Sequence, residues 1–371
     1  MTDYFTATET GLMLAGSVEQ ALARTGYQPG GDGSALWPVL SQIGLAGAEI
    51  APDHGGSGGT LADLAPSLTA LGKRACVTPA LSSVIAASWL LQAAGNAGQK
   101  ATWLPALASG EATATLAHGE HAARGHLYVV ETQATRTASG WELNGAKEVV
   151  ADGGEADLFI VSARLSGGPA EPDGLALFLV PASTPELTLR TFALYDGSLA
   201  AGLSFDALTL PEEALLGIAG EASVLIGQAH DRAIAGLCAE AVGVMEGLFG
   251  LTLDYVRARE QFGQPIGRFQ AIQHRMADMF TELELAKSMA SYAVLAAGLE
   301  NCAARARAMS AAKFAIANAA RMIGQSSVQL HGAIALTQEY AAGHYFKRLT
   351  RIERQFGDAA YHLDRFAGLA A

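Results

Sequence analysis

The spacing of apolar residues changes period twice along this chain of 371 residues. Up to about residue 112, apolar residues recur every three or four positions, which is typical of amphipathic helices. From residue 113 to about 215, β-branched residues alternate with polar ones and Asn144-Gly145 marks a turn, which predicts strands. From Glu212 onward the helical period returns. The sequence therefore predicts a multidomain α+β protein with a β-domain between two helical domains.

We place the domain boundaries at 1–112, 113–215 and 216–371. The middle domain is expected to be a mostly antiparallel sheet or small barrel. The third domain carries long helical segments at close spacing, which predicts a four-helix bundle. The helices expected in the first domain are Leu12–Arg24, Leu36–Ile43, Leu61–Leu71, Ser82–Ala94 and Lys100–Ala108, and those of the third are about 219–258, 267–298, 301–329 and a shorter pair within 337–368.

The net charge of −12 argues against nucleic acid or an anionic membrane as the main partner. Three cysteines without short spacing fit a reducing cytoplasm rather than a disulfide framework, and the histidines show no metal-binding pattern. The N-terminal stretch MTDYFTATET has no basic region followed by an apolar run, so we expect no signal peptide. The longest apolar stretches are interrupted before the length of about 20 residues that spans a bilayer. We therefore expect a cytoplasmic protein.

One short stretch, REQFGQPIGRFQAIQH, separates two long helical patterns. Gly263, Pro265 and Gly267 interrupt the helix there, and Arg259 directly precedes the interruption. A guanidinium binds phosphate oxygens through two parallel hydrogen bonds, and a broken helix leaves backbone groups free to meet a ligand. The stretch is consistent with a phosphate-binding junction between helices.

The order of domains, together with REQFGQPIGRFQ and VQLHGAIALTQEY, resembles the acyl-CoA dehydrogenase family over nearly the whole chain. The stretch GLAGAEIAPDHGGSGG is similar to the N-terminal loop of that family. VQLHGAIALTQEYAAGHYFKRL followed by FGDAAYHLDRFA resembles its short subunits, such as those of pimeloyl-CoA dehydrogenases and of heterotetrameric steroid-degrading enzymes.

This resemblance implies FAD as the cofactor, held across a subunit boundary by residues of the neighbouring chain. It places Arg259 against the pyrophosphate, and it places Phe262, Gln270 and Gln273 near the adenosine half. The family's Gln-x-x-Gly-Gly motif corresponds to Gln329, His331, Gly332 and Ala333 in this chain, so that an alanine stands at the second glycine. A β-carbon at that position can obstruct close backbone approach.

The family reaction requires a carboxylate that removes a proton beside the thioester carbonyl. Phe356 stands at the family's commonest position for this base, and Asp358 follows two residues later. Some members use a carboxylate on the first long helix of the third domain. There Glu240 is the only charge within 233–245, and Asp231 is the alternative. Glu240 is either a base with a raised pKa, or a carboxylate that faces solvent or pairs with Arg259 or Lys287.

The β-domain departs further from the family pattern. Gly119 and Ala151 replace threonines, and Val149 replaces the tryptophan that shields the flavin, whereas Glu120 and Lys147 are retained. These replacements should weaken binding of the flavin ring in this subunit's own β-domain. Arg124, in the same divergent loop, either meets a CoA phosphate or is exposed to solvent.

Two hypotheses follow. In the first, the chain is a self-sufficient homo-oligomeric acyl-CoA dehydrogenase with Glu240 or Asp231 as base. In the second, it is the small subunit of an α2β2 complex and contributes clamping residues to an FAD whose ring lies in a larger paralogue. The substrate is an acyl-CoA in both. The expected partners are that paralogue, a second copy of the chain and an electron-transfer flavoprotein. A related oxidase and a non-catalytic structural subunit remain as lesser alternatives.

Overall fold

The computed structural model describes residues 7–369, and these fall into two compact units. One unit combines Met1–Leu36, Leu61–Val77 and Ile234–Ala371, and the other combines Trp37–Thr60 and Thr78–Ala233. The units therefore cut across the three predicted domains, whose boundaries stay predictions. Residues 1–6, on which the expectation about a signal peptide partly rests, lie outside the described residues.

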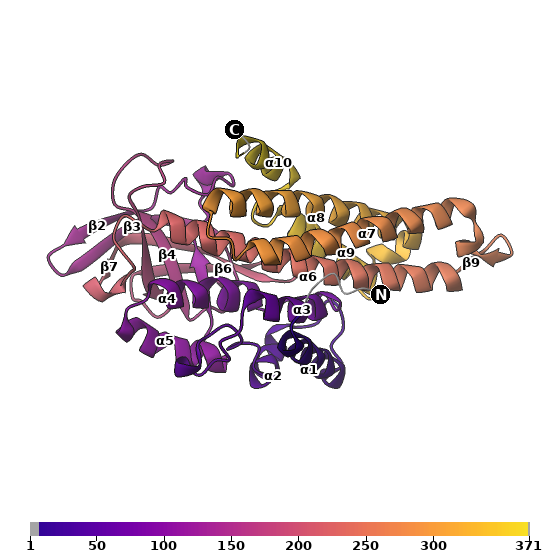
Figure 1. Ribbon diagram of the computed structural model, residues 1–371, viewed down its shortest axis with the longest axis horizontal. Coiled ribbons are helices and arrows are strands. Elements are labelled where there is room, and N and C mark those ends of the chain that lie inside the picture. The colour runs from indigo at the N-terminus through magenta and orange to yellow at the C-terminus, as the bar shows by residue number, and fades with distance from the viewer. Residues whose placement is uncertain (1–6, 370–371) are drawn as a thin grey trace. The chain divides into compact units, whose positions relative to one another are not determined.

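The first unit is helical and contains the predicted C-terminal bundle (Figure 1). In the bundle, α7 packs against α8, and α8 packs against α9 and α10. Each long helix begins and ends within a few residues of its predicted range, because the apolar spacing marks the buried face directly. This helical unit contains α1 (Glu9–Thr25), α3 (Leu61–Gly72), most of α6 (Ser223–Ala258), α7 (Gln270–Ala296), α8 (Cys302–His331), the 3₁₀-helix η7 (Gly332–Leu336), α9 (Ala341–Arg354) and α10 (Ala359–Gly368), together with shorter elements.

Two glycines allow α3 to lie unusually close to α6. A β-carbon at Gly72 would lie 2.2 Å from the carbonyl oxygen of Glu240, and one at Gly243 would lie 2.0 Å from the carbonyl oxygen of Thr69. The Thr69 hydroxyl donates a hydrogen bond of 3.0 Å to the Ala239 carbonyl. Backbone therefore meets backbone along this contact, which we call the glycine seam.

The second unit is built on an eight-stranded sheet with the strand order β6-β7-β3-β2-β4-β5-β8. Most neighbouring strands are antiparallel, as predicted, but β1 joins β4 in parallel, so the sheet is mixed. The strands are β1 (Ala114–Ala117), β2 (Gln133–Thr137), β3 (Gly140–Ala151), β4 (Leu158–Arg164), β5 (Leu175–Pro181), β6 (Leu187–Ala193), β7 (Leu199–Leu210) and β8 (Leu215–Leu216).

Strand β4 is buried on both faces, and its side chains divide between two cores. Leu158 and Ile160 contribute to a core shared with helical residues such as Leu90 and Leu104. Phe159 and Val161 contribute to a core within the sheet. The alternation follows from the two-residue period of a strand.

The helices of this second unit are α2 (Trp37–Gln42), α4 (Ser88–Ala94) and α5 (Ala97–Ser109). The helix expected at Ser82–Ala94 is only partly an α-helix, because Ala80–Ala87 is a π-helix that runs directly into α4. Ser88 donates a hydrogen bond of 2.7 Å to the Ser83 carbonyl inside this wider turn. Apolar spacing over so short a stretch does not distinguish the two helix types.

Helix α6 is long and apolar enough to cross a membrane by length and composition, contrary to the expectation from the interrupted sequence. However, 72% of its most apolar window is buried inside the structure. This burial is what the core helix of a folded bundle requires.

Candidate functional site

The antiparallel helices bring the predicted clamping residues to one end of the bundle. Helix α6 ends beside the junction, α7 begins there, and α8 returns to the same end (Figure 1). The contact is direct, because the rings of Tyr255 and His331 lie 4.4 Å apart and the Tyr255 hydroxyl donates to the His331 carbonyl at 3.3 Å. Residues far apart in the sequence thus lie at one end of the bundle.

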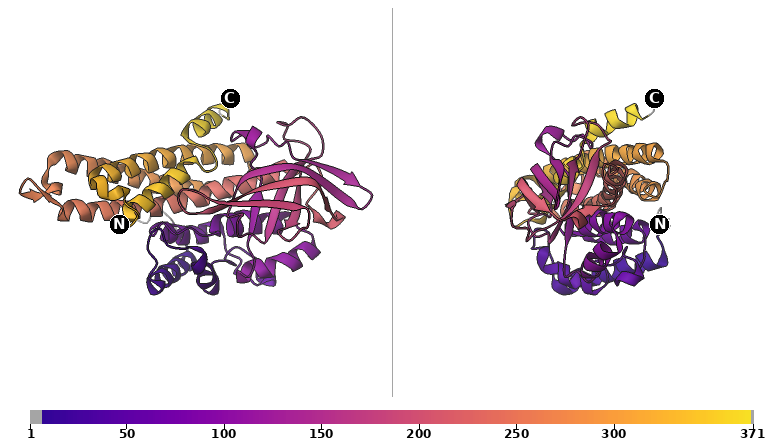
Figure 2. Two further views of the ribbon diagram at one scale, coloured as in Figure 1. Left: turned by 180° about the vertical axis from the view of Figure 1, so that it is seen from behind. Right: turned by 90° about the vertical axis from the view of Figure 1, so that its left-hand side faces the viewer.

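The junction itself is a two-stranded hairpin formed by β9 (Glu260–Gln261) and β10 (Gln264–Pro265). It extends beyond the ends of the long helices, as both views show (Figures 1 and 2). Its turn consists of Phe262 and Gly263, with φ values of 55° and 77°. Phe262 is 93% exposed and contacts Phe269 edge to face at 6.1 Å. A phenylalanine in a left-handed turn at an exposed tip is unfavourable for an isolated chain.

Most of the predicted clamping residues are exposed and therefore accessible to a ligand: Arg259, Phe262, Gln270, Gln273, Gln329, Gly332 and Ala333. The Gln273 amide donates to the Gly267 carbonyl at 3.0 Å and so ties the start of α7 to the junction. Ala333, at the predicted second glycine of the motif, is exposed like its neighbour Gly332.

His331 differs from the other members of this set because it is buried, with 4% exposure. Its Nε2 lies 3.2 Å from the Thr252 hydroxyl, and burial lowers its pKa to about 4. The ring is therefore neutral and packs between Tyr255 and Tyr340. Its position suits support of the α8 terminus rather than contact with an anion.

Glu240 lies in the middle of α6, and its partner is Arg348 on α9 rather than Arg259 or Lys287. One carboxylate oxygen accepts from Nε at 2.6 Å and lies 2.5 Å from Nη2. The two side chains are 4% and 5% exposed as residues. Asp231, the alternative base, is 2% exposed. Sequence reasoning missed Arg348 because it lies 108 residues from Glu240.

Phe356, predicted to stand at the family's usual base position, lies in a tight turn between α9 and α10. Phe356 adopts φ 62° and is followed by Gly357 at 104°. Asp358 caps α10, where its carboxylate accepts from the Tyr361 amide at 2.9 Å. Asp358 is thus engaged in a local hydrogen bond. Lys313 from α8 reaches this turn, although sequence reasoning did not select it.

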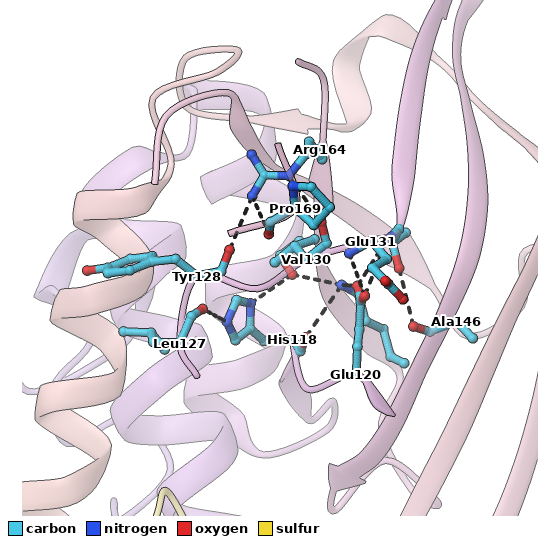
Figure 3. A network of polar contacts seen from close by, with 12 residues as sticks. His118, Glu120, Leu127, Tyr128, Val130, Glu131, Ala146, Arg164 and Pro169 are labelled. Carbon is cyan, nitrogen blue, oxygen red and sulfur yellow. Dashed lines mark hydrogen bonds and ion pairs between the residues drawn. The ribbon is translucent and has the colours of Figure 1, made fainter. Parts of the chain in front are cut away.

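In the second unit, which we call the β-unit, a buried polar network supports the loop that follows β1 (Figure 3). The Lys147 ammonium lies 2.5 Å from Glu120 and 3.0 Å from the Ser162 hydroxyl. Glu120 also accepts from the amides of Glu131 and Thr132. Glu120 therefore connects the loop to Lys147 on β3 and to the backbone of Glu131 and Thr132.

His118 completes this network with a defined tautomer. Its Nε2 lies 2.5 Å from the Leu127 carbonyl, which can only accept, so Nε2 carries the proton. Its Nδ1 lies 2.8 Å from the Ser162 hydroxyl, which therefore donates to it. Burial, together with the nearby Lys147 charge, lowers the pKa of His118 to about 4, so the ring is neutral.

The residues predicted to face a flavin ring include no tryptophan, and the two predicted threonine positions carry no hydroxyl. Val149 lies in a bulge of β3 with φ 51°, and its side chain is 55% exposed. The Glu148 amide donates to the Gly119 carbonyl at 2.8 Å, which ties this bulge to the loop. Arg124 is exposed. Neither Gly119 nor Ala151 offers a hydroxyl.

Family models match nearly the whole chain. The N-terminal domain of acyl-CoA dehydrogenase matches residues 15–111, the middle domain matches residues 115–207, and the C-terminal domain matches residues 228–367. Acyl-CoA dehydrogenase FadE12 of Mycobacterium tuberculosis (strain ATCC 25618 / H37Rv) is 30% identical over 331 residues, which cover 86% of this chain and 84% of that protein.

Two solved structures have the same fold. Butyryl-CoA dehydrogenase from Megasphaera elsdenii superposes with a TM-score of 0.88 at 22% identity, with 99% of each chain covered. The ChsE4-ChsE5 complex from Mycobacterium tuberculosis gives a TM-score of 0.85 at 25% identity, with 99% of this chain and 98% of that chain covered.

Proposed function

Because this chain belongs to the acyl-CoA dehydrogenase family, we propose that it is a subunit of an FAD-dependent acyl-CoA dehydrogenase whose active site is completed by a second, different chain. The family oxidises an acyl-CoA thioester between its α and β carbons. When FAD is bound, it would accept the hydride. The proposal concerns how that activity is divided between chains.

The observation that carries the proposal is the ion pair between Glu240 and Arg348. A general base at neutral pH needs a carboxylate whose proton affinity is raised, and a close guanidinium has the opposite effect. Phe356, at the other base position, has no group that accepts a proton. The two positions together support a base that comes from another chain. Asp231 stays the alternative base if the chain is self-sufficient.

The exposed end of the bundle fits the diphosphate half of FAD. Arg259 offers a guanidinium fork, and Gln270 and Gln329 add amide groups on helices that end or begin there. From Glu240 to Arg259 the helix rises about 28 Å, at about 1.5 Å per residue. This separation is larger than that between the diphosphate and the ring of one FAD. If Glu240 were nevertheless the base of this chain's own site, Arg259 would therefore have to clamp the FAD of a neighbouring chain.

The β-unit fits the ring half of FAD poorly. Gly119 and Ala151 lack hydroxyl donors, and Val149 has too little surface to shield a flavin. We therefore derive no chemical step in this chain's own β-unit. Its ordered loop can still contact the larger partner.

The proposed assembly is an α2β2 heterotetramer of this chain and a larger paralogue. The complex named ChsE4-ChsE5, which has the same fold, supports two unlike chains of this kind in one assembly. An electron-transfer flavoprotein as acceptor, a bulky or dicarboxylic acyl group as substrate, and a cytoplasmic location remain predictions.

The visible spectrum of the purified chain tests the proposal. Produced alone, the chain should be colourless or carry well under one flavin per chain. Produced with the paralogue, the complex should carry FAD that is bleached by an acyl-CoA. A stoichiometric flavin that an acyl-CoA reduces in the isolated chain would overturn the two-chain proposal.

The clamp has its own test with a matched control. Arg259→Ala should lower FAD retention by the complex at least tenfold, because a charge-assisted fork to phosphate is lost. Arg257→Ala removes an exposed arginine from the last turn of the same helix and should leave retention unchanged. Equal retention in both variants would remove Arg259 from the clamp.

A further inference from the structure

Lys313 is fully buried on α8, where it is the only charged residue between Ala308 and Ala320. Its ammonium donates to two backbone carbonyls, that of Glu353 at 3.0 Å and that of Gly357 at 2.9 Å. Helix α9 ends at Arg354, so one of these carbonyls lies in its last turn and the other lies in the turn that follows. One side chain thus joins a helix terminus to the segment beyond it.

A second side chain holds the carbonyl between them. His362 on α10 is fully buried, and its Nε2 lies 2.9 Å from the Phe356 carbonyl oxygen. Burial and the nearby Lys313 charge lower the pKa of this histidine to about 3, so the ring is neutral and Nε2 carries the proton. Three backbone carbonyls within five residues therefore accept from two buried side chains.

The backbone so held is one that a phenylalanine rarely adopts. Phe356 has φ 62°, and the following Gly357 at 104° has no room for a side chain, because a β-carbon there would lie 2.3 Å from Tyr361. Strained conformations persist where surrounding groups determine them, and they cluster at functional sites. Position 356 is also where the family commonly places its base.

We propose that Lys313 is the positioning residue of the Gln355–Asp358 turn, and that its ammonium holds the left-handed backbone at Phe356 and so fixes the direction of that side chain. The hydrogen bonds of Lys313 and His362 to this segment lie within one unit and do not depend on the proposed function. The interpretation of position 356 as a wall of the acyl-CoA site rests on the proposed function.

The charge of Lys313 depends on groups from three helices. Burial lowers its pKa to about 8, while Cys238 on α6, Glu353 on α9 and Asp358 before α10 act in the opposite direction. Glu353 is itself paired with Arg321, and Arg365 of α10 lies 3.5 Å from the Ser310 hydroxyl on α8. A lysine exposed by opening of the turn returns to its ordinary pKa of 10.5. Opening between pH 8 and 10.5 therefore takes up one proton and becomes less favourable as pH rises.

Amide hydrogen exchange, read by mass spectrometry on peptides covering residues 351–362, tests the role. Lys313→Met keeps a long apolar side chain but removes both donors, so exchange of these peptides at neutral pH should rise at least tenfold, while peptides of α7 stay unchanged. Lys287→Met is the matched control, because Lys287 forms ion pairs with Glu246 and Glu284 on α6 and α7. It should leave the turn unchanged.

A second test measures the pH dependence of amide exchange in the unmodified protein. The intrinsic exchange rate of an open amide rises about tenfold per pH unit. The equilibrium constant for an opening that takes up one proton falls about tenfold per pH unit. These two effects cancel, so the observed exchange rate of the turn should be nearly constant between pH 8 and 9.5. Peptides of α1 should accelerate over the same range, and all isotope envelopes should stay unimodal.

Two results would overturn the proposal: exchange of the turn that is unchanged in Lys313→Met, or an increase spread evenly over the helical unit. Acceleration of the turn in step with α1 in the unmodified protein would also overturn it. None of these readouts involves flavin or a partner, so a self-sufficient enzyme would refute the proposed function and leave this inference standing.

Discussion

Two lysines, one in each unit, are buried completely and balance their charge in different ways. Lys147 in the β-unit lies 2.5 Å from a carboxylate, that of Glu120. Lys313 in the helical unit donates to two backbone carbonyls. Burial lowers the pKa of both to about 8. In the first case the loss of the charge leaves a directly paired carboxylate buried without its cation, whereas in the second it leaves two carbonyl groups without their donor.

The largest expected loss of stability comes from breaking the ion pair between Lys147 and Glu120. Lys147→Met should cost about 3–5 kcal/mol of unfolding free energy, because it leaves the Glu120 carboxylate buried without its cation. Lys313→Met should cost clearly less. Urea denaturation of both variants measures the difference, and Lys147→Met combined with Glu120→Gln should recover most of the loss. Equal costs for the two lysines would contradict the comparison.

The ion pair of the helical unit should respond in the same way as the pair of the β-unit. Glu240→Gln should cost about 3 kcal/mol, because it leaves the Arg348 guanidinium buried and uncompensated. Arg348→Met in the same chain should restore much of that stability. A Glu240→Gln variant that keeps full stability but abolishes turnover would instead identify Glu240 as the base.

The pH dependence of stability sharpens the comparison further. Each lysine has a folded pKa of about 8, below its ordinary 10.5, so the unfolded chain binds more protons between these values. Stability should therefore rise with pH by up to about 1.4 kcal/mol per unit for each lysine. The test measures how much the free energy of unfolding changes between pH 8 and pH 9. The change in each Lys→Met variant is subtracted from the change in the unmodified chain. This subtraction removes shared contributions such as Cys76, whose pKa burial raises to about 12.

The smallest expected change in stability concerns Val149, a residue of the β-unit with a left-handed backbone conformation. Val149→Gly should stabilise the chain by about 0.5–1 kcal/mol, because glycine adopts a positive φ without the steric cost of a β-branched side chain. Thermal unfolding measures the gain. Val150→Gly, at the neighbouring buried position, is the control and should destabilise. A loss of stability in Val149→Gly would mean that the exposed valine makes contacts that outweigh the strain.

The sequence predicted those parts of the fold whose signal is local. Long helices such as α8 were placed within a few residues, because their apolar spacing records the buried face. The parallel pairing of β1 with β4 was not predicted, since it joins segments that no turn connects. The π-helix at Ala80–Ala87 was not predicted either, because its apolar spacing over two turns resembles that of an α-helix.

The predicted site shows the same division. The junction at Arg259 is a local motif, and the antiparallel helices bring its predicted companions to the same end. The partner of Glu240 could not be predicted, because Arg348 reaches it only through tertiary packing. Lys313 carried a usable signal: it is a lone charge in an apolar helical run, the same criterion that selected Glu240.

The glycine seam restricts how this molecule can move and evolve. Since Gly72 and Gly243 bring main chain against main chain, adding one methyl group at either position would push α3 away from α6. A movement that separates the two helices would therefore have to break these backbone contacts. Glu240, whose own carbonyl forms part of the seam, therefore lies where α3 and α6 are in direct backbone contact.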